Sequence, residues 1–114
     1  MNTPLARHTL LELHGCNAAI LNDPDALKEL LRTAVLRGRG TIVTEVFHMF
    51  SPQGVSGVVV IAESHVAIHT WPENGYAAVD IFSCGTKLDH AMIRDWIQAG
   101  LQAASVEIRE LTRG

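Results

Sequence analysis

Six strand-like segments with only two helical segments among them constrain the fold of this chain more than any other sequence feature. The strand-like segments are rich in β-branched and aromatic residues or alternate in polarity, and they cover 8–14, 41–50, 58–62, 66–71, 76–82 and 106–111. One amphipathic helical pattern follows the first of these segments, and the other precedes the last. The predicted order is therefore β-α-β-β-β-β-α-β.

The first helix has clear start and stop signals. Asp23 can cap its N-terminus and Pro24 suits the first helical position, while Gly38 and Gly40 can end it. Its apolar stripe consists of Leu27, Leu30, Leu31, Ala34 and Val35. The second helix is predicted over 87–104, and its apolar side consists of Leu88, Met92, Ile93, Trp96, Ile97, Leu101 and Ala104.

Two helices cannot cover both faces of a six-stranded sheet, so both are expected on the same face. We predict an α+β fold, a two-layer α/β sandwich with a mostly antiparallel sheet, in a single domain over residues 1–114. Residues 58–61 are apolar on both sides of their strand, which favours cover on both faces of the sheet. A homodimer that packs through the second face or an edge of the sheet would supply that cover.

Composition and charge exclude several classes of protein. Hydrophobic residues make up 47% and charged residues 18% of the sequence, which excludes intrinsic disorder. A net charge of −3 argues against binding to nucleic acid or to an anionic membrane. The longest apolar run, 58–62, is strand-sized, and residues 1–15 lack the apolar segment of a signal peptide. The two cysteines, Cys16 and Cys84, suit a reducing compartment, so we expect a cytoplasmic location.

Side chains that can act as acid, base or nucleophile concentrate between positions 48 and 85. They are His48, Ser56, Glu63, Ser64, His65, His69, Glu73, Asp80, Ser83 and Cys84. By contrast, His8, His14 and His90 lie near the ends of predicted elements, where we interpret them as ordinary polar residues. A serine between two apolar strands, such as Ser64, requires a hydrogen-bonding reason.

A metal site in this cluster would use His65, His69 and Cys84. The residues between the two histidines favour a strand, and four residues of a strand span about 13 Å. This is too far for both imidazoles to reach one ion, so we predict no metal site.

A serine hydrolase would use Ser64 or Ser56 as nucleophile, with His69 and Asp80. The required residue types are present, but neither serine lies in the Gly-x-Ser-x-Gly pattern of a nucleophile elbow. Such triads are defined by geometry, which the sequence alone does not supply.

Self-cleavage between Glu63 and Ser64 is the third possibility. The serine hydroxyl would attack the preceding carbonyl and convert the amide to an ester, and a base would then eliminate the ester to leave dehydroalanine. Hydrolysis of dehydroalanine produces a pyruvoyl group. This chemistry requires a constrained serine, a base and a group that polarises the carbonyl. A tight connection between two strands could supply the first requirement, and His69 and Ser56 the others. The residue types alone do not rank this above the hydrolase.

Residues 54–85, GVSGVVVIAESHVAIHTWPENGYAAVDIFSCG, resemble the short prokaryotic form of the S-adenosylmethionine decarboxylase family. The similarity extends through RHTLLEL near the start and TIVTEVFHMFSPQG to the last predicted strand. The family is pyruvoyl-dependent, so the resemblance implies a lyase that makes its own cofactor from its chain.

The resemblance assigns roles to five residues of the cluster. It places the self-cleavage between Glu63 and Ser64, which would produce a 63-residue β chain and a 51-residue α chain that begins with the pyruvoyl group from Ser64. His69 matches the proton acceptor in processing, and Ser56 matches a residue that assists processing. Cys84 matches the proton donor in catalysis.

Three further residues match substrate contacts of the family. Phe50 matches an aromatic side chain that stacks on adenine, Glu73 a carboxylate that holds the ribose hydroxyls, and Glu12 a contact at the site. We also hypothesise that the Phe50 ring attracts the sulfonium cation of the substrate.

The implied reaction converts S-adenosylmethionine to S-adenosylmethioninamine and CO2, and the product donates the aminopropyl group for spermidine. The substrate amine would form a Schiff base with the pyruvoyl carbonyl, which accepts the electron pair released with CO2. A homodimer of processed α/β protomers is expected, with no nucleic-acid or membrane partner. Two alternatives remain open: the same chemistry on ornithine or arginine, and an unprocessed binding or regulatory subunit.

The resemblance also sets a geometric requirement. Ser64 and His69 are an odd number of residues apart, so an ideal strand would place them on opposite faces. We therefore predict a turn or bulge between Ser64 and the strand that carries His69.

Overall fold

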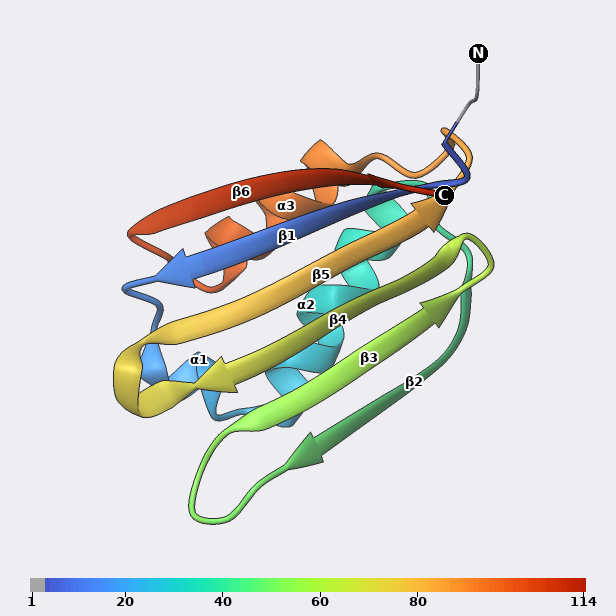
Figure 1. Cartoon of the computed structure of the whole chain (residues 1–114). Helices are drawn as coiled ribbons and strands as arrows, with labels where there is room; N and C mark the ends of the chain where they lie inside the picture. Colours follow the sequence, from blue (N-terminus) through green and yellow to red (C-terminus); the bar gives the residue numbers. More distant parts are fainter. Residues whose placement is uncertain (1–3) are drawn as a thin grey trace.

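A computed structural model describes residues 4–114 and confirms an α+β fold with one six-stranded sheet (Figure 1). The strands are β1 (Ala6–His14), β2 (Ile42–Met49), β3 (Val55–Ile61), β4 (Ser64–Trp71), β5 (Tyr76–Cys84) and β6 (Ser105–Arg113). Their order in the sheet is β2-β3-β4-β5-β1-β6, and every neighbouring pair is antiparallel. The sheet predicted as mostly antiparallel is therefore antiparallel throughout.

The two main helices, α2 (Pro24–Arg37) and α3 (His90–Gly100), both lie on one face of the sheet, as predicted (Figure 1). Each helix begins after an aspartate whose carboxylate accepts a hydrogen bond from a backbone N–H of the first turn. In α2 the Ala26 N–H donates to the Asp23 carboxylate at 3.1 Å, and in α3 the Met92 N–H donates to the Asp89 carboxylate at 3.0 Å. The described residues contain no helix long and apolar enough to cross a membrane.

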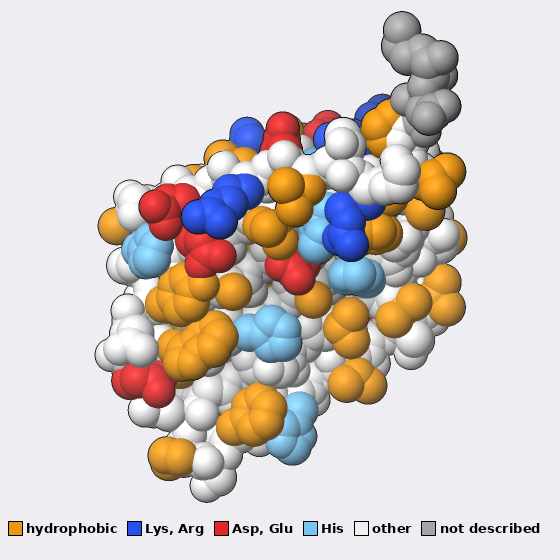
Figure 2. Space-filling view, in the orientation of Figure 1, with side chains coloured by type: hydrophobic (Ala, Val, Ile, Leu, Met, Phe, Trp, Pro, Cys, Tyr) orange, Lys and Arg blue, Asp and Glu red, His pale blue; other side chains and the backbone are white. Residues whose placement is uncertain are grey.

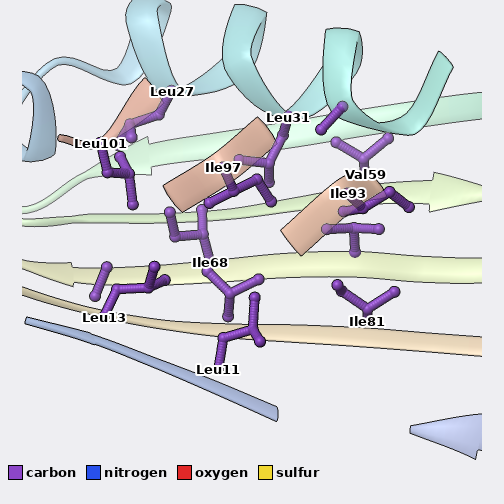
Figure 3. Close-up of a cluster of buried hydrophobic side chains, with 14 of the residues drawn as sticks. Leu11, Leu13, Leu27, Leu31, Val59, Ile68, Ile81, Ile93, Ile97 and Leu101 are labelled. Atoms are coloured by element: carbon purple, nitrogen blue, oxygen red, sulfur yellow. The ribbon is translucent and has the colours of Figure 1, made fainter. Parts of the chain in front are cut away.

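The hydrophobic core fills the space between the helices and the sheet (Figure 3). Alternate strand residues and one stripe of each helix supply it, because side chains alternate between the faces of a strand. Its fully buried members include Leu11, Leu13, Leu27, Leu31, Val59, Ile68, Ile81, Ile93, Ile97 and Leu101. The core therefore uses one face of the sheet and leaves the other without helical cover.

The uncovered face, which we call the open face, has exposed apolar side chains among histidines and a few charged residues (Figure 2). Val46, Val60, Trp71 and Leu111 lie on it and are between 38% and 65% exposed. The predicted two-sided apolar pattern of 58–61 is seen, because Val59 and Ile61 enter the core while Val60 lies on the open face.

Several element boundaries differ from the prediction. β3 begins at Val55, so residues 55–57, which precede the predicted strand 58–62, also belong to a strand. Gly57 lies within this strand, where a Cβ would overlap with the ring of Phe47. The connector predicted at 63–65 is shorter, since β4 already begins at Ser64.

The second helix was predicted too long. It begins at His90 rather than at 87 and ends at Gly100 rather than at 104, and Gln102 beyond it has a positive φ of 55°. Two short helical elements, α1 (Ala18–Leu21) and the 3-10 turn η1 (Pro72–Asn74), were not predicted. Such one-turn elements are too short to produce a helical periodicity.

Candidate active site

Two groups of the predicted site residues lie at opposite ends of β3 and β4. Ser64 and Cys84 lie where the β3–β4 hairpin meets the end of β5, whereas Ser56 and His69 lie near the other end of the same two strands. Antiparallel pairing explains this, because the first residues of β3 and of β4 are at opposite ends of the pair.

Ser64 has an unusual backbone conformation at the tip of the hairpin. Only Ala62 and Glu63 separate β3 from β4, and Ser64 has a φ of 149°. Positive φ values in this range are rare for any residue except glycine and indicate local strain. The Ser64 Oγ lies 3.7 Å from the Sγ of Cys84 on the neighbouring strand.

The predicted turn or bulge between Ser64 and the strand of His69 is wrong. Residues from Ser64 to Trp71 pair with β5 in one continuous register, and Ser64 is itself the first residue of β4. The irregularity is instead the φ of Ser64. Because the strand between them is regular, Ser64 and His69 stay apart.

The Glu63 carbonyl, which Ser64 would attack, already has a hydrogen-bond donor. The backbone N–H of Cys84 donates to this oxygen at 2.9 Å. The Glu63 side chain accepts from the backbone N–H of Thr41 at 3.0 Å and from Lys87 Nζ at 3.2 Å. The Thr41 N–H, together with Lys87, lowers the pKa of Glu63 below its usual value. The carbonyl and the side chain of Glu63 are thus both held in place.

At the other end, Ser56 and His69 form a cross-strand pair on the open face. The Ser56 Oγ lies 2.7 Å from the Nδ1 of His69. The pair borders a hollow of about 320 Å³, and Phe50 and Glu73 line the same hollow. Four of the predicted site residues therefore surround one cavity of the size of a small ligand, and Phe50 is 49% exposed there.

Glu12 lies on the same row of the open face as His69. Ala78 on the intervening strand β5 pairs with both residues, so only its small side chain lies between the Glu12 and His69 side chains. The Tyr76 hydroxyl donates to the Glu12 carboxylate, and the Tyr76 ring lies 5.2 Å from the ring of Trp71. Burial and the Glu12 hydrogen bond raise the pKa of Tyr76 to about 12.

The two groups do not meet within one chain. Ser64 and His69 are five positions apart along β4, which corresponds to about 16 Å at the rise of a β-strand. A side chain spans only part of that distance. A base at His69 therefore cannot reach the Ser64 of its own chain.

The alternatives considered from the sequence meet geometric obstacles. Within residues 4–114 no three His, Cys, Asp or Glu side chains converge as a metal would require. His65 instead stacks on Phe82, with ring centroids 5.5 Å apart. In a hydrolase triad, the Asp80 carboxylate would have to orient His69. It lies instead 3.9 Å from the Nε2 of His8.

The structure also reveals a buried polar network that the sequence analysis missed. The ring nitrogens of His90 lie 2.7 Å from Thr9 Oγ1 and 2.6 Å from Ser83 Oγ, and all three residues are at most 3% exposed. His90 does lie at the end of an element, as interpreted, but it points into the core. No local signal in the sequence indicates this, because its partners are seven and 81 residues away.

Burial, with a smaller effect of the Arg7 charge, lowers the pKa of His90 to about 4. The unfolded chain binds a proton at His90 below pH 6.5, whereas the folded chain does not until about pH 4. We therefore expect the free energy of unfolding to fall by about 3 kcal/mol between these two pH values. Urea titrations of wild type and His90→Gln at pH 7 and pH 4.5 test this. An equal pH dependence in both chains would contradict it.

Comparisons with known proteins agree on one family. The sequence profile described as S-adenosylmethionine decarboxylase matches residues 7–114. The S-adenosylmethionine decarboxylase proenzymes of Pelotomaculum thermopropionicum and Moorella thermoacetica are each 49% identical over 110 residues, which is 96% of this chain and 87% and 88% of theirs. The crystal structure of the Aquifex aeolicus adenosylmethionine decarboxylase superimposes with a TM-score of 0.92 at 34% identity, covering 99% of this chain and 93% of that one.

Proposed function

The chain belongs to the S-adenosylmethionine decarboxylase family, and from this we propose that it is a self-processing, pyruvoyl-dependent enzyme that converts S-adenosylmethionine to S-adenosylmethioninamine and CO2. The observation that carries the proposal is the geometry of the Glu63–Ser64 bond. Ser64 has a φ of 149°, and the preceding carbonyl accepts a hydrogen bond from the Cys84 N–H. A strained serine beside a polarised carbonyl is what self-cleavage requires.

The cleavage proceeds through an ester. The Ser64 Oγ attacks the Glu63 carbonyl carbon, and negative charge develops on the oxygen that the Cys84 N–H already contacts. The C–N bond breaks, so that Glu63 becomes esterified to Ser64. A base then takes the α-proton of Ser64, and elimination releases Glu63 as a carboxylate. The dehydroalanine at position 64 tautomerises to an imine, which water hydrolyses to a pyruvoyl group with loss of ammonia.

The residues around position 64 fit the pyruvoyl group, which supplies an electron sink for the pair released with CO2. The Cys84 side chain is exposed and lies next to Ser64, so its thiol can donate a proton to the substrate carbon that loses CO2. This role requires a free thiol, which fits a reducing cytoplasm.

A second copy of the chain completes the site. The His69 of one chain cannot reach its own Ser64, so the base must come from elsewhere. We infer a homodimer in which the open faces pack together, because that face carries the Ser56–His69 pair and exposed apolar side chains (Figure 2), and Cys84 lies on the outward side of β5. A two-fold axis would place the Ser56–His69 hollow of one protomer over the Ser64–Cys84 end of its partner, twice per dimer.

The hollow is the proposed site of the adenosine part of the substrate. Phe50 would stack on adenine, Glu73 would accept hydrogen bonds from the ribose hydroxyls, and Glu12 would lie across the row from His69. The sulfonium cation is permanent, so an aromatic face and carboxylates suit this part of the site.

Phe50→Leu is expected to raise KM about 2- to 30-fold, because loss of the cation–π attraction costs about 0.5–2 kcal/mol. The cleavage and kcat of the cleaved enzyme should be unaffected. Steady-state kinetics on Phe50→Leu and on Phe50→Tyr, which keeps an aromatic face, test the prediction. Unaltered KM in Phe50→Leu would exclude a substrate contact at Phe50.

The proposed function is tested by intact mass measurement of the denatured protein, followed by activity assays. Two fragments of 63 and 51 residues are expected, and the second should resist amine reagents because its N-terminus is a ketone. CO2 release is then measured with S-adenosylmethionine, ornithine and arginine as separate substrates. A chain that remains whole disproves the self-processing, and release from ornithine or arginine alone disproves the substrate.

A further inference from the structure

The Thr9–His90–Ser83 network lies directly beneath the proposed cleavage site. Ser83 precedes Cys84 in β5 and pairs with Ser64 across the sheet, while its own side chain points to the core. His90 is the first residue of α3, and its Nε2 lies 2.6 Å from the Ser83 Oγ. The network thus connects the start of a helix to the strand position opposite the scissile bond.

The network also fixes the loop that follows Cys84. Residues 85–89 connect β5 to α3, and the Ser83–His90 hydrogen bond joins the residues on the two sides of this loop. This contact ties the end of β5 to α3, in addition to the pairing of β5 with β1 and β4. Two functional contacts depend on that end, namely the Cys84 N–H on the Glu63 carbonyl and the Cys84 Sγ beside Ser64.

The His90 ring bonds the two hydroxyls in opposite roles. A neutral imidazole has one N–H donor and one acceptor nitrogen, so one hydroxyl accepts a hydrogen bond and the other donates one. Burial keeps the ring neutral at physiological pH. A buried network in which every member has a partner is rigid, because breaking one hydrogen bond leaves a buried polar group unpaired.

We propose that His90 is a positioning residue, which through Ser83 holds the Cys84 N–H and thiol in the geometry needed for self-cleavage and for decarboxylation. The inference rests on the proposed self-cleavage. His90 itself does not touch the reacting atoms. Its effect is on the alignment of Cys84, so it should change rates and not substrate affinity.

The test replaces the whole network by apolar side chains of similar size in Thr9→Val/Ser83→Ala/His90→Leu. This variant leaves no buried hydroxyl or ring nitrogen unpaired, so it is expected to unfold at a temperature near that of the wild type. Its cleavage after cell-free synthesis should be at least about tenfold slower, and kcat of the cleaved fraction should fall similarly with KM unchanged. Cleavage at the wild-type rate would overturn the proposal.

Matched controls separate positioning from stability. Leu27→Ala removes core packing at the other end of the helical layer, and it should lower the unfolding temperature while leaving the cleavage rate unchanged (Figure 3). If the triple variant does not fold, Ser83→Ala and Thr9→Val decide, since only Ser83→Ala severs the contact beside the site. Slower cleavage in Ser83→Ala than in Thr9→Val supports the proposal, and equal cleavage rates in the two variants overturn it. A wild-type chain that is not cut would instead disprove the proposed function.

Discussion

Ser64→Ala is expected to remain one polypeptide of 114 residues and to release CO2 from S-adenosylmethionine at least about a thousandfold more slowly than the wild type. Alanine has no hydroxyl, so the Glu63 carbonyl has no neighbouring nucleophile and no ketone is formed. Denaturing mass spectrometry and a CO2 release assay measure the two effects.

The matched control for this variant is Ser105→Ala. Ser105 is exposed at the start of β6, away from the hairpin, and its substitution should leave both cleavage and activity intact. Fragments of 63 and 51 residues from Ser64→Ala would show that another group starts the cleavage, and the assignment of Ser64 would then be wrong.

Mixed dimers provide the second large effect. Ser64→Ala and His69→Ala are each expected to be uncut and inactive as homodimers. A mixed dimer has one complete site, because the intact His69 of one chain faces the intact Ser64 of the other. We expect the His69→Ala chain to be cut and the Ser64→Ala chain to stay whole, with about half of the wild-type activity.

Two different affinity tags on co-expressed chains allow the mixed dimer to be purified. The matched control combines Ser64→Ala with Cys84→Ala. Ser64 and Cys84 belong to the same group, so this pairing produces no complete site and should not restore CO2 release. An uncut His69→Ala chain in the mixed dimer would contradict the shared site, because it would mean that the base acts within its own chain.

Local patterns in the sequence predicted most of the fold. The first helix begins after Asp23 and ends before Gly38, as its capping residues indicated. The errors occur at residues whose position is decided by tertiary packing and not by local sequence preference. The predicted strand 58–62 omits Gly57, which lies within β3 and accommodates the Phe47 ring. Leu88 was predicted to belong to the second helix. It lies instead in the loop before α3, and its side chain is buried there.

The candidate site was predicted less completely. Phe50, Ser56, His69 and Glu73 were chosen by resemblance, and the structure places all four around one hollow. The sequence also suggested that Ser64 is constrained, but it placed the irregularity between Ser64 and His69 instead of in Ser64 itself. Strand periodicity describes ideal geometry, so it cannot locate a single residue that departs from it.

The sequence by itself determined the order of the elements, the family and the residue types available for the chemistry. These depend on local preference, on periodicity and on a long contiguous match. Only the tertiary structure decided which residues meet. Ser64 reaches Cys84 across 20 positions, while His69, five positions away on the same strand, lies at the opposite end of it. The reason is that an extended strand separates near neighbours in sequence, whereas antiparallel pairing brings distant ones together.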